Sequence, residues 1–401
     1  MKRILFVALA LISFSALSAQ EVASNTTIEN QISEIDARLA KNEKRTALLE
    51  KAKQYFKITG FVQGEYDWLD DRKGHASTGS SSFYIRRARL SMAGDLYKGE
   101  KGAKLDYRLY IDLARVKLPN PNPILDMWVR YQPIKEFGVQ LGQFKNPITF
   151  EASVAPSKYE FIDFSYAVCN LAKMGADDVA GLNVTARDAG FQFFGGFIHR
   201  DGYSIINYNV GLLNGNGINA KDDNKSKDVF GKITIKPSKD LGIALYYQRG
   251  EANLSGFEAE KYAEYGWSGN AEYVITHRWG GGFQYISDKV FARGEYIAGI
   301  TGHMPSEGAY LQGGYNFIMP KAGKLWAGAM VDYFCRNVFD YTKRDTANAK
   351  IDTRYSVCLG YEPIKYFHMQ LAYSLEQRTH YTFANNRHFG NGVKFMATVV
   401  F

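Results

Sequence analysis

Apolar and polar residues alternate along most of this chain, and two neighbouring runs show the pattern most clearly. From Leu105 to Leu113 every odd position is aliphatic or aromatic, and three of the four even positions are charged. The run from Leu125 to Gln132 repeats the arrangement. A period of two predicts a strand with one apolar face and one charged face. Such strands suit either a soluble sheet or a membrane barrel with lipid outside and a charged lumen, so both alternatives stay open on this pattern alone.

Strand patterns of this kind follow one another from Tyr55 to the end of the chain, least regularly over Gly266 to Ile300. Short turns join alternate pairs of strands, at Tyr97 to Gly102, Pro133 to Phe137, Arg200 to Tyr203, Pro237 to Asp240, Pro320 to Lys324 and Glu362 to Tyr366. Longer polar connections join the others, including Asp70 to Ser81, Gly215 to Lys227, Asn337 to Lys350 and His380 to Arg387. This sorting of connections predicts an all-β fold, a transmembrane antiparallel β-barrel of about 16 strands.

Both ends of the chain agree with export to an outer membrane. A basic start at Lys2 and Arg3 precedes the apolar stretch Ile4 to Ala16, and a small residue at Ala19 offers a cleavage site. We therefore predict a signal peptide over residues 1–19. The last strand, Val393 to Phe401, ends on an aromatic residue in its apolar face, which looks like the assembly signal of outer-membrane proteins.

Residues 20–54 are predicted to form a periplasmic helical segment. Apolar residues in it are spaced alternately by four and three, at Ile28, Ile32, Ile35 and Leu39. This spacing is typical of a short coiled-coil seam, which lapses at Asn42 and Thr46. Two interpretations stay open: a solvated linker helix, or a coiled coil that trimerises the protein below the membrane.

Composition and charge narrow the choice of function. The 401 residues include 38 glycines and 10 prolines, and 14% are aromatic, as expected of a strand-rich chain. The net charge of +8 is scattered along the chain, so nucleic-acid binding is not expected. The three cysteines lack metal-ligand spacing, and we expect neither a metal site nor a cofactor.

Several short motifs occur in the order that they take in a known family. They are Phe83-Tyr84-Ile85-Arg86-Arg87-Ala88-Arg89-Leu90, Asp126 within a strand, Gly142-Gln143-Phe144-Lys145-Asn146-Pro147 with Glu151, and Arg187-Asp188-Ala189-Gly190. The chain thereby resembles the phosphate-selective porin O and P family over residues 55–401, most strongly over 83–190.

The resemblance implies a sixteen-stranded porin domain over residues 55–401, assembled as a homotrimer among the lipids of a Gram-negative outer membrane. It further implies a basic lumen through which small anionic solutes such as phosphate diffuse passively. The chain departs from the family pattern at Phe161 to Ser165, where no arginine stands near Asp163. This departure bears on phosphate selectivity more than on the porin fold.

The connection from Gln143 to Ala186 is by far the longest in the chain. Loops of this length are usually functional or disordered, and its aromatic residues, such as Tyr159 and Phe161, favour packing over disorder. We predict that this loop folds into the lumen and constricts it.

Alternation places a set of arginines on the lumen face, where guanidinium groups suit an anion path. The candidates for lining this path are Arg87, Arg89, Arg108, Arg130, Lys145, Arg293 and Arg354. Only the family motif places Lys145 in the set. Strict alternation would put it on the same face as Val139 and Leu141, which is the apolar face. The same alternation predicts that Arg86 faces the lipid, near the rim of the barrel.

Carboxylates share the lumen face and oppose the arginines. They are Glu65, Asp67, Asp95, Asp106, Asp112, Asp126, Glu295, Asp352 and Glu376. The turn near residues 98–102 is expected to pair Arg89 with Asp112, which leaves Arg87 opposite Ala114. The alternative for every arginine is a salt-bridge ladder that stiffens the wall, and we expect it more for Arg89 and Arg108 than for Arg87 and Arg130.

Catalysis is not expected, because the seven histidines form no recognisable pattern with a serine and an acid. A structural or adhesive outer-membrane barrel without an open channel is the alternative function, because its strands would alternate in the same way. The sequence therefore favours a porin and keeps this alternative open.

Overall fold

The computed structural model describes residues 25–73, 76–114, 123–172, 186–222, 224–253, 273–302, 304–320, 322–336, 350–380 and 386–401. The chain divides into two units, Met1–Phe56 and Lys57–Phe401. The predicted signal peptide lies outside the described residues.

The first unit is one helix, α2, which spans Asn25–Tyr55 over the predicted helical segment. Side chains on it are exposed, including Ile35 and Leu39 of the predicted seam. Among the described residues, no helix is both long and apolar enough to cross a membrane. The apolar stripe of α2 is therefore compatible with either interpretation of the segment, and the coiled coil stays a prediction.

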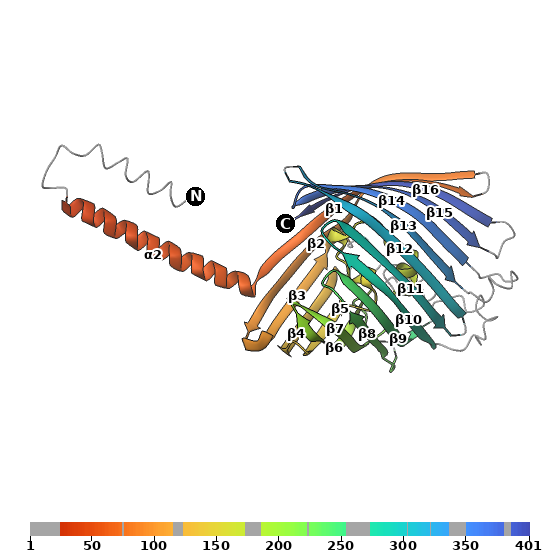
Figure 1. Ribbon diagram of the computed structural model, residues 1–401, viewed down its shortest axis with the longest axis horizontal. Coiled ribbons are helices and arrows are strands. Elements are labelled where there is room, and N and C mark those ends of the chain that lie inside the picture. The colour runs from red at the N-terminus through yellow and green to blue at the C-terminus, as the bar shows by residue number, and fades with distance from the viewer. Residues whose placement is uncertain are drawn as a thin grey trace. The chain divides into compact units, whose positions relative to one another are not determined.

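The second unit is a closed barrel of sixteen antiparallel strands, which confirms the predicted fold (Figure 1). The strands are β1 (Lys57–Lys73), β2 (Ala76–Lys98), β3 (Lys104–Asp112), β4 (Ile124–Ile134), β5 (Phe137–Lys145), β6 (Arg187–Arg200), β7 (Tyr203–Leu213), β8 (Asp228–Ile235), β9 (Leu241–Asn253), β10 (Tyr273–Ile286), β11 (Val290–Thr301), β12 (Met304–Met319), β13 (Gly323–Arg336), β14 (Lys350–Ile364), β15 (Phe367–His380) and β16 (Asn386–Val400). Each strand pairs with its neighbours in sequence, and β1 pairs with β16 to close the barrel.

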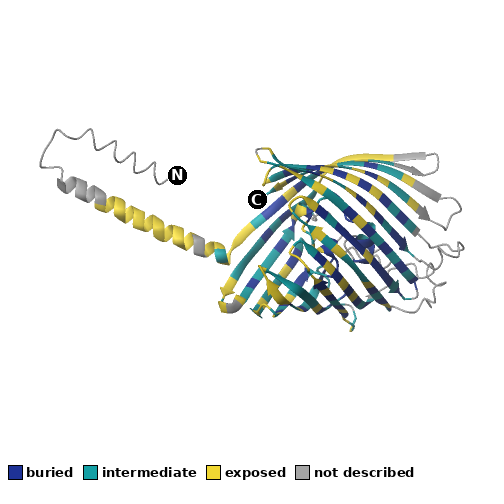
Figure 2. Cartoon of the chain, in the orientation of Figure 1, coloured by how far each residue is buried: buried dark blue, intermediate teal, exposed yellow. Residues whose placement is uncertain are grey.

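Burial along the strands is the reverse of that in a soluble protein. Buried and more exposed residues alternate along many of the strands (Figure 2), and the buried ones are often polar. On β15, for example, Gln370 is 1% exposed whereas its neighbour Leu371 is 49% exposed. An apolar outer face and a polar inner face require lipid around the barrel, because water would favour the opposite order. This observation decides between the two alternatives that alternation left open.

The end of the chain completes the barrel wall. Phe401 exchanges two backbone hydrogen bonds with Gly60, of 2.8 and 2.9 Å, directly after β16 has paired with β1. The edges of the sheet are thereby paired with each other, which leaves no open strand edge within the bilayer.

The short turns fall where they are predicted, but one predicted long loop is wrong. Asp70 to Ser81 was expected to be irregular, whereas the β1–β2 ladder continues up to the pair Lys73 and Ala76. The polar residues of this stretch still form backbone pairs between the two strands. The change to polar residues therefore shows where the lipid-facing part of the strands ends, and the strands themselves continue beyond it. The connection Gly215 to Lys227 is a loop between β7 and β8, while 337–349 and 381–385 lie outside the described residues.

Candidate functional site

The described part of the connection between β5 and β6, residues 146–172, lies inside the barrel against its wall, as predicted. It contains α3 (Phe150–Ser153), the short 3-10 turn η3 (Pro156–Lys158) and α4 (Tyr166–Leu171). Wall side chains from three strands donate hydrogen bonds to its backbone: Trp326 and Gln370 to the carbonyl oxygen of Glu160, both at 3.0 Å, and Arg354 to that of Phe164 at 2.6 Å. Residues 146–172, which we call the lumen loop, are thus fixed against the inner wall.

Apolar packing explains why this segment folds inward. Tyr159, Phe161 and Phe164 are buried against Phe291 and Trp326 of the wall. In a second cluster, Ala167, Val168 and Leu171 of α4 pack with Ile297, Tyr310 and Phe334. The lumen loop therefore brings its own hydrophobic core into a polar lumen, and this core fixes its position there.

Two buried glutamates organise the start of the lumen loop. The carboxylate of Glu295, on β11, accepts hydrogen bonds from the backbone nitrogens of Phe150 and Glu151, at 2.8 and 3.0 Å. The carboxylate of Glu151 accepts hydrogen bonds from the backbone nitrogen and hydroxyl of Ser165 and from the hydroxyl of Tyr159. Burial raises the pKa of Glu151 to about 7, even though these hydrogen bonds act in the opposite direction.

The tip of the lumen loop is held by charge. Asp163 forms ion pairs with Arg86 at 2.8 Å and Lys394 at 2.6 Å, and Arg354 lies 3.9 Å away. Burial opposes ionisation of Asp163, but the three cations outweigh burial and hold the pKa of Asp163 well below its usual range. The arginine missing from the neighbouring sequence is therefore replaced in space by cations from β2, β14 and β16.

The predicted lipid-side position of Arg86 is wrong. The β1–β2 register shifts between Gln63 and Gly64, so that Gln63 pairs with Arg87 and Gly64 pairs with Ile85. Arg86 is the extra residue of this β-bulge, and its side chain turns inward to Glu65 and Asp163. Strict alternation fails at a bulge because one residue is added to one strand only.

Three of the predicted path residues belong to ion pairs on the inner wall. Arg89 contacts Asp112 at 2.8 Å, in the predicted register. Arg130 contacts Asp106 at 2.6 Å, and Arg108 lies 3.5 Å from Asp126. The salt-bridge ladder accounts for the contacts of all three, including Arg130, for which it was expected less.

Two more of the predicted residues lie beneath the lumen loop. Arg293 is 3.4 Å from Glu160, and Arg354 pairs with Asp332 at 2.9 Å while it binds the loop backbone. Their side chains are 3% and 5% exposed. Through these contacts both residues support the lumen loop.

Arg87 and Lys145 differ from the other five residues of the predicted path. Arg87 donates to the amide oxygen of Gln63 at 2.8 Å, and Lys145 donates to the carbonyl oxygen of Val154 at 3.1 Å. Within the described ranges, neither forms an ion pair with a carboxylate. Lys145 faces inward because Gly142, with a φ of 126°, breaks the alternation of β5. The structure thus brings together, beside the lumen loop, two basic side chains that have no carboxylate in direct contact among the described residues.

Sequence reasoning missed the full environment of these two residues. Arg187, noted only as part of a family motif, contacts Asp126 at 2.5 Å. The ring of Tyr110 is flanked by the guanidinium groups of Arg108, Arg89 and Arg187, whose centres are 4.3, 5.6 and 5.9 Å from its centroid. Periodicity predicted the inward direction of Tyr110, but no sequence signal showed that three strands bring arginines to one ring.

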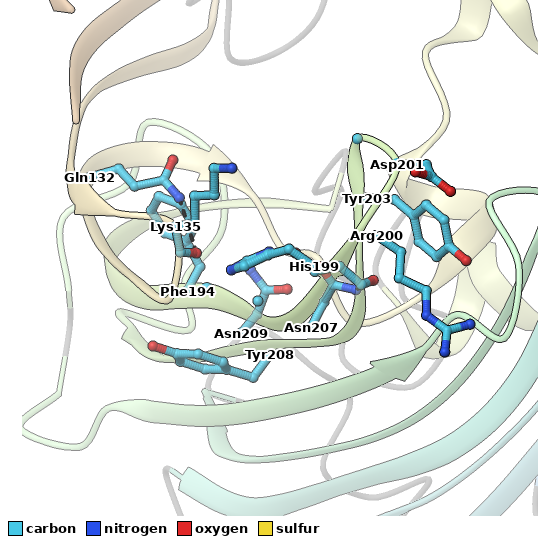
Figure 3. A pocket seen from close by; sticks show the side chains of 14 residues that line it. Gln132, Lys135, Phe194, His199, Arg200, Asp201, Tyr203, Asn207, Tyr208 and Asn209 are labelled. Atoms are coloured by element: carbon cyan, nitrogen blue, oxygen red, sulfur yellow. Dashed lines mark hydrogen bonds between the residues drawn. The ribbon is translucent and has the colours of Figure 1, made fainter. Parts of the chain in front are cut away.

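A cavity of about 490 Å³ lies at the rim with the short turns. It is lined by residues around the β4–β5 and β6–β7 turns, among them Gln132, Lys135, His199 and Arg200. Lys135 and Arg200 stand at opposite sides of it (Figure 3). His199 is bound to Glu136 at 2.7 Å and to Ser204 at 2.9 Å. The cavity therefore does not gather its cations at one point.

Comparisons with known proteins agree with this geometry. A family model described as phosphate-selective porin O and P matches residues 56–401. Among solved structures, an anion-selective porin from Comamonas acidovorans is 11% identical with a TM-score of 0.60, covering 86% of this chain and 99% of that one. The outer-membrane channel DcaP of Acinetobacter baumannii is 15% identical with a TM-score of 0.59, covering 86% and 97%.

The trimer form of OmpT, an outer-membrane protein of Vibrio cholerae, is 11% identical with a TM-score of 0.57, covering 86% and 99%. At these identities the likeness shows the fold alone. No curated protein sequence matches the chain.

Proposed function

The chain belongs to the phosphate-selective porin O and P family, and we propose that its lumen passes small anions by passive diffusion, with a preference for phosphate-type oxyanions. As a member of a porin family with a sixteen-stranded barrel, the protein is an outer-membrane channel. The preference among solutes is the part that we propose here.

The observation that carries the proposal is the pair Arg87 and Lys145. The other arginines of the predicted path, Arg89, Arg108, Arg130, Arg293 and Arg354, each have a carboxylate within 4 Å, so their charges largely cancel at short range. Arg87 and Lys145 form no such pair in the described part of the chain. Arg187, Arg89 and Arg87 lie close enough to act electrostatically on Lys145, and the carboxylate of Asp126 acts on it in the opposite sense. A passage bounded by low-dielectric walls concentrates this positive field and raises the local concentration of anions.

The lumen loop supplies the other requirement, which is a narrow passage. It packs along β11 and β13–β16 and binds Lys145 through Val154. A solute is thereby forced past Arg87 and Lys145 instead of crossing a wide lumen. A guanidinium group binds the oxygens of phosphate or carboxylate through two parallel donors, which favours oxyanions over spherical halides.

Planar-bilayer recording tests this proposal. Purified protein should give discrete ohmic current steps in chloride, and added phosphate should lower the chloride current by occupying the same passage. Arg87→Ala should weaken this block, because a lumen cation without a contacting carboxylate is lost. Arg130→Ala is the matched control: it also removes one lumen arginine, and Asp106 still keeps Lys104 as a partner at 3.1 Å.

Each result has a defined meaning. Block of equal strength in both variants and the unaltered protein would contradict the role of Arg87. Current steps that added phosphate does not block would support a porin without a preference for phosphate. No current steps from folded protein would favour the structural or adhesive barrel.

The remaining proposals concern assembly and location. We propose a homotrimer, supported by the trimer form of OmpT among similar structures and by the exposed Ile35 and Leu39 of α2. We further propose that residues 1–19 are removed as a signal peptide and that residues 20–54 lie in the periplasm. Mass spectrometry of the protein purified from membranes gives its first residue, and a start other than residue 20 would contradict the cleavage site.

A further inference from the structure

A second loop also reaches the inner wall of the barrel. It connects β7 with β8, and its residue Ile218 packs against a buried cluster of Phe61, Tyr110 and Leu125. These three residues belong to β1, β3 and β4. Ile218 therefore contacts strands that are far from it in sequence and that form a different part of the wall from β7 and β8. An aliphatic side chain placed there covers part of the polar lumen with an apolar surface.

Three hydrogen bonds fix the residue that follows Ile218. The backbone nitrogen of Asn219 donates to the amide oxygen of Gln143 at 2.6 Å. The side-chain amide of Asn219 donates to the carbonyl oxygen of Ile124 at 2.8 Å and accepts from the amide of Gln143 at 3.1 Å. The loop is therefore attached to both β4 and β5 beside the place where Ile218 packs.

The backbone of this loop is adapted to the same position. Asn219 has a φ of 57°, a left-handed conformation that asparagine adopts more readily than most residues. Asp188 accepts a hydrogen bond from the backbone nitrogen of Gly215 at 2.7 Å. Farther along, Asp222 pairs with Lys227 and accepts from the backbone of Asn224. Both ends of the inserted stretch are thus held, as expected of a loop with one defined conformation.

The position of Ile218 relates it to the cations described above. Tyr110, which Ile218 contacts, is the ring flanked by Arg89, Arg108 and Arg187. Gln143, which binds Asn219, lies two residues before Lys145 on the same inward-turned end of β5. The second loop therefore meets the passage at the same group of cations, from the wall opposite the main attachments of the lumen loop.

We propose that residues 215–219 form a second constriction element and that Ile218 helps to set the size limit of the channel. The lumen loop narrows the passage from one wall, and Ile218 narrows it from the other. An apolar side chain at a constriction resists wetting and offers no hydrogen bonds in exchange for a solute's hydration shell. It therefore hinders large hydrated solutes more than small ones. This inference rests on the channel function and does not require an anion preference.

Ile218→Ala tests the proposal in planar bilayers and in liposome swelling. The shorter side chain should raise the single-channel conductance roughly twofold and admit larger neutral sugars, because a hydrophobic constriction is widened. Ile233→Ala is the matched control, since Ile233 on β8 is 56% exposed on the outer face of the barrel. Folding of each variant is checked by its migration on gels without boiling.

Two variants at Asn219 give an independent route. Asn219→Gly loses the side-chain bonds but keeps the left-handed backbone, whereas Asn219→Ala loses the bonds and is strained at this φ. Conductance should rise in both, and more in Asn219→Ala. Unchanged conductance and an unchanged sugar limit in folded Ile218→Ala, or in folded Asn219→Gly should Ile218→Ala not fold, would overturn the proposal. Because neutral sugars report size alone, failure here is distinguishable from failure of the anion preference.

Discussion

At the scale of single residues, Glu151 is the group through which pH should act on the lumen loop. Its pKa in the docked loop is about 7, above the ordinary value of 4.5. The docked loop therefore binds a proton more tightly than a solvated loop does, and docking is weakened as the pH rises between these two values. The free energy that stabilises docking of the loop falls by at most about 3 kcal/mol over this range.

This shift predicts pH-dependent behaviour of the open channel. Current noise from movement of the loop should increase from about pH 5 to about pH 8, because the charged form of Glu151 is disfavoured by burial. In Glu151→Gln the group no longer titrates, and the rise in noise over this range should disappear. Equal pH dependence with and without Glu151 would show that another group is responsible. Glu295, which accepts hydrogen bonds from the backbone nitrogens of Phe150 and Glu151, is the first alternative.

Gly142 decides the direction of the residues that follow it. Its φ is 126°, and a Cβ atom there would lie 2.2 Å from the carbonyl oxygen of Met127. Gly142→Ala should therefore lower the stability of the barrel by about 1–3 kcal/mol, measured by urea unfolding in lipid vesicles. Gly231→Ala is the control, because a Cβ atom at Gly231 meets nothing within 4 Å. Equal losses in the two variants would contradict this account of Gly142.

Sequence reasoning at this scale predicted which residues face inward better than it predicted what they contact. The pairing of Arg89 with Asp112 followed from the register of one hairpin, because both residues lie within it. The partners of Arg354 and Lys394 did not follow, since they come from the lumen loop far away in sequence. The predicted direction of Arg86 was wrong for a local reason, because no residue type in the sequence indicates the β-bulge.

At the scale of elements, Asp163 joins the lumen loop to three strands of the wall. Asp163→Ala would leave Lys394 without its carboxylate at 2.6 Å and would remove one of the two acids that Arg86 contacts. Losing one member of this partly buried group should destabilise docking of the loop by roughly 2–3 kcal/mol. The expected readout is larger and more variable single-channel current.

The control for Asp163 is Asp95→Ala, which removes a carboxylate near a turn whose partners Lys98 and Lys104 are more exposed, at 57% and 33%. Exposed ion pairs contribute about 0–1 kcal/mol, so this variant should leave the current unchanged. A steady current of normal size in Asp163→Ala would mean that apolar packing alone holds the loop.

The helix α2 has its own test. Deleting residues 24–53 should abolish the trimer on native gels if α2 assembles the protein, because its exposed apolar stripe would then be the main contact between subunits. An unchanged trimer would support the linker-helix interpretation and would place assembly on the barrel. The spacing of four and three predicted the helix, but spacing alone does not identify the partner of its apolar side.

At the scale of the whole molecule, the fold was predictable because alternation and loop sorting both indicate one architecture. The exposed Leu371 beside the buried Gln370 shows why: one period-two pattern specifies both a lipid face and a lumen face. The candidate site was less predictable, since two loops from different parts of the chain build it. Length indicated that the first loop enters the lumen, whereas nothing in the polar stretch Gly215 to Lys227 indicated the packing of Ile218.

The central claim is that Arg87 and Lys145 give the passage its charge preference, and a reversal-potential measurement tests it most directly. In a potassium chloride gradient, the unaltered channel should show a reversal potential of the sign that chloride preference gives. The double variant Arg87→Glu and Lys145→Glu should shift that potential toward cation preference. The same charge change at Lys41 and Lys44 of α2, outside the barrel, should leave it unchanged. A reversal potential that is the same in the unaltered channel and in both double variants would contradict the claim.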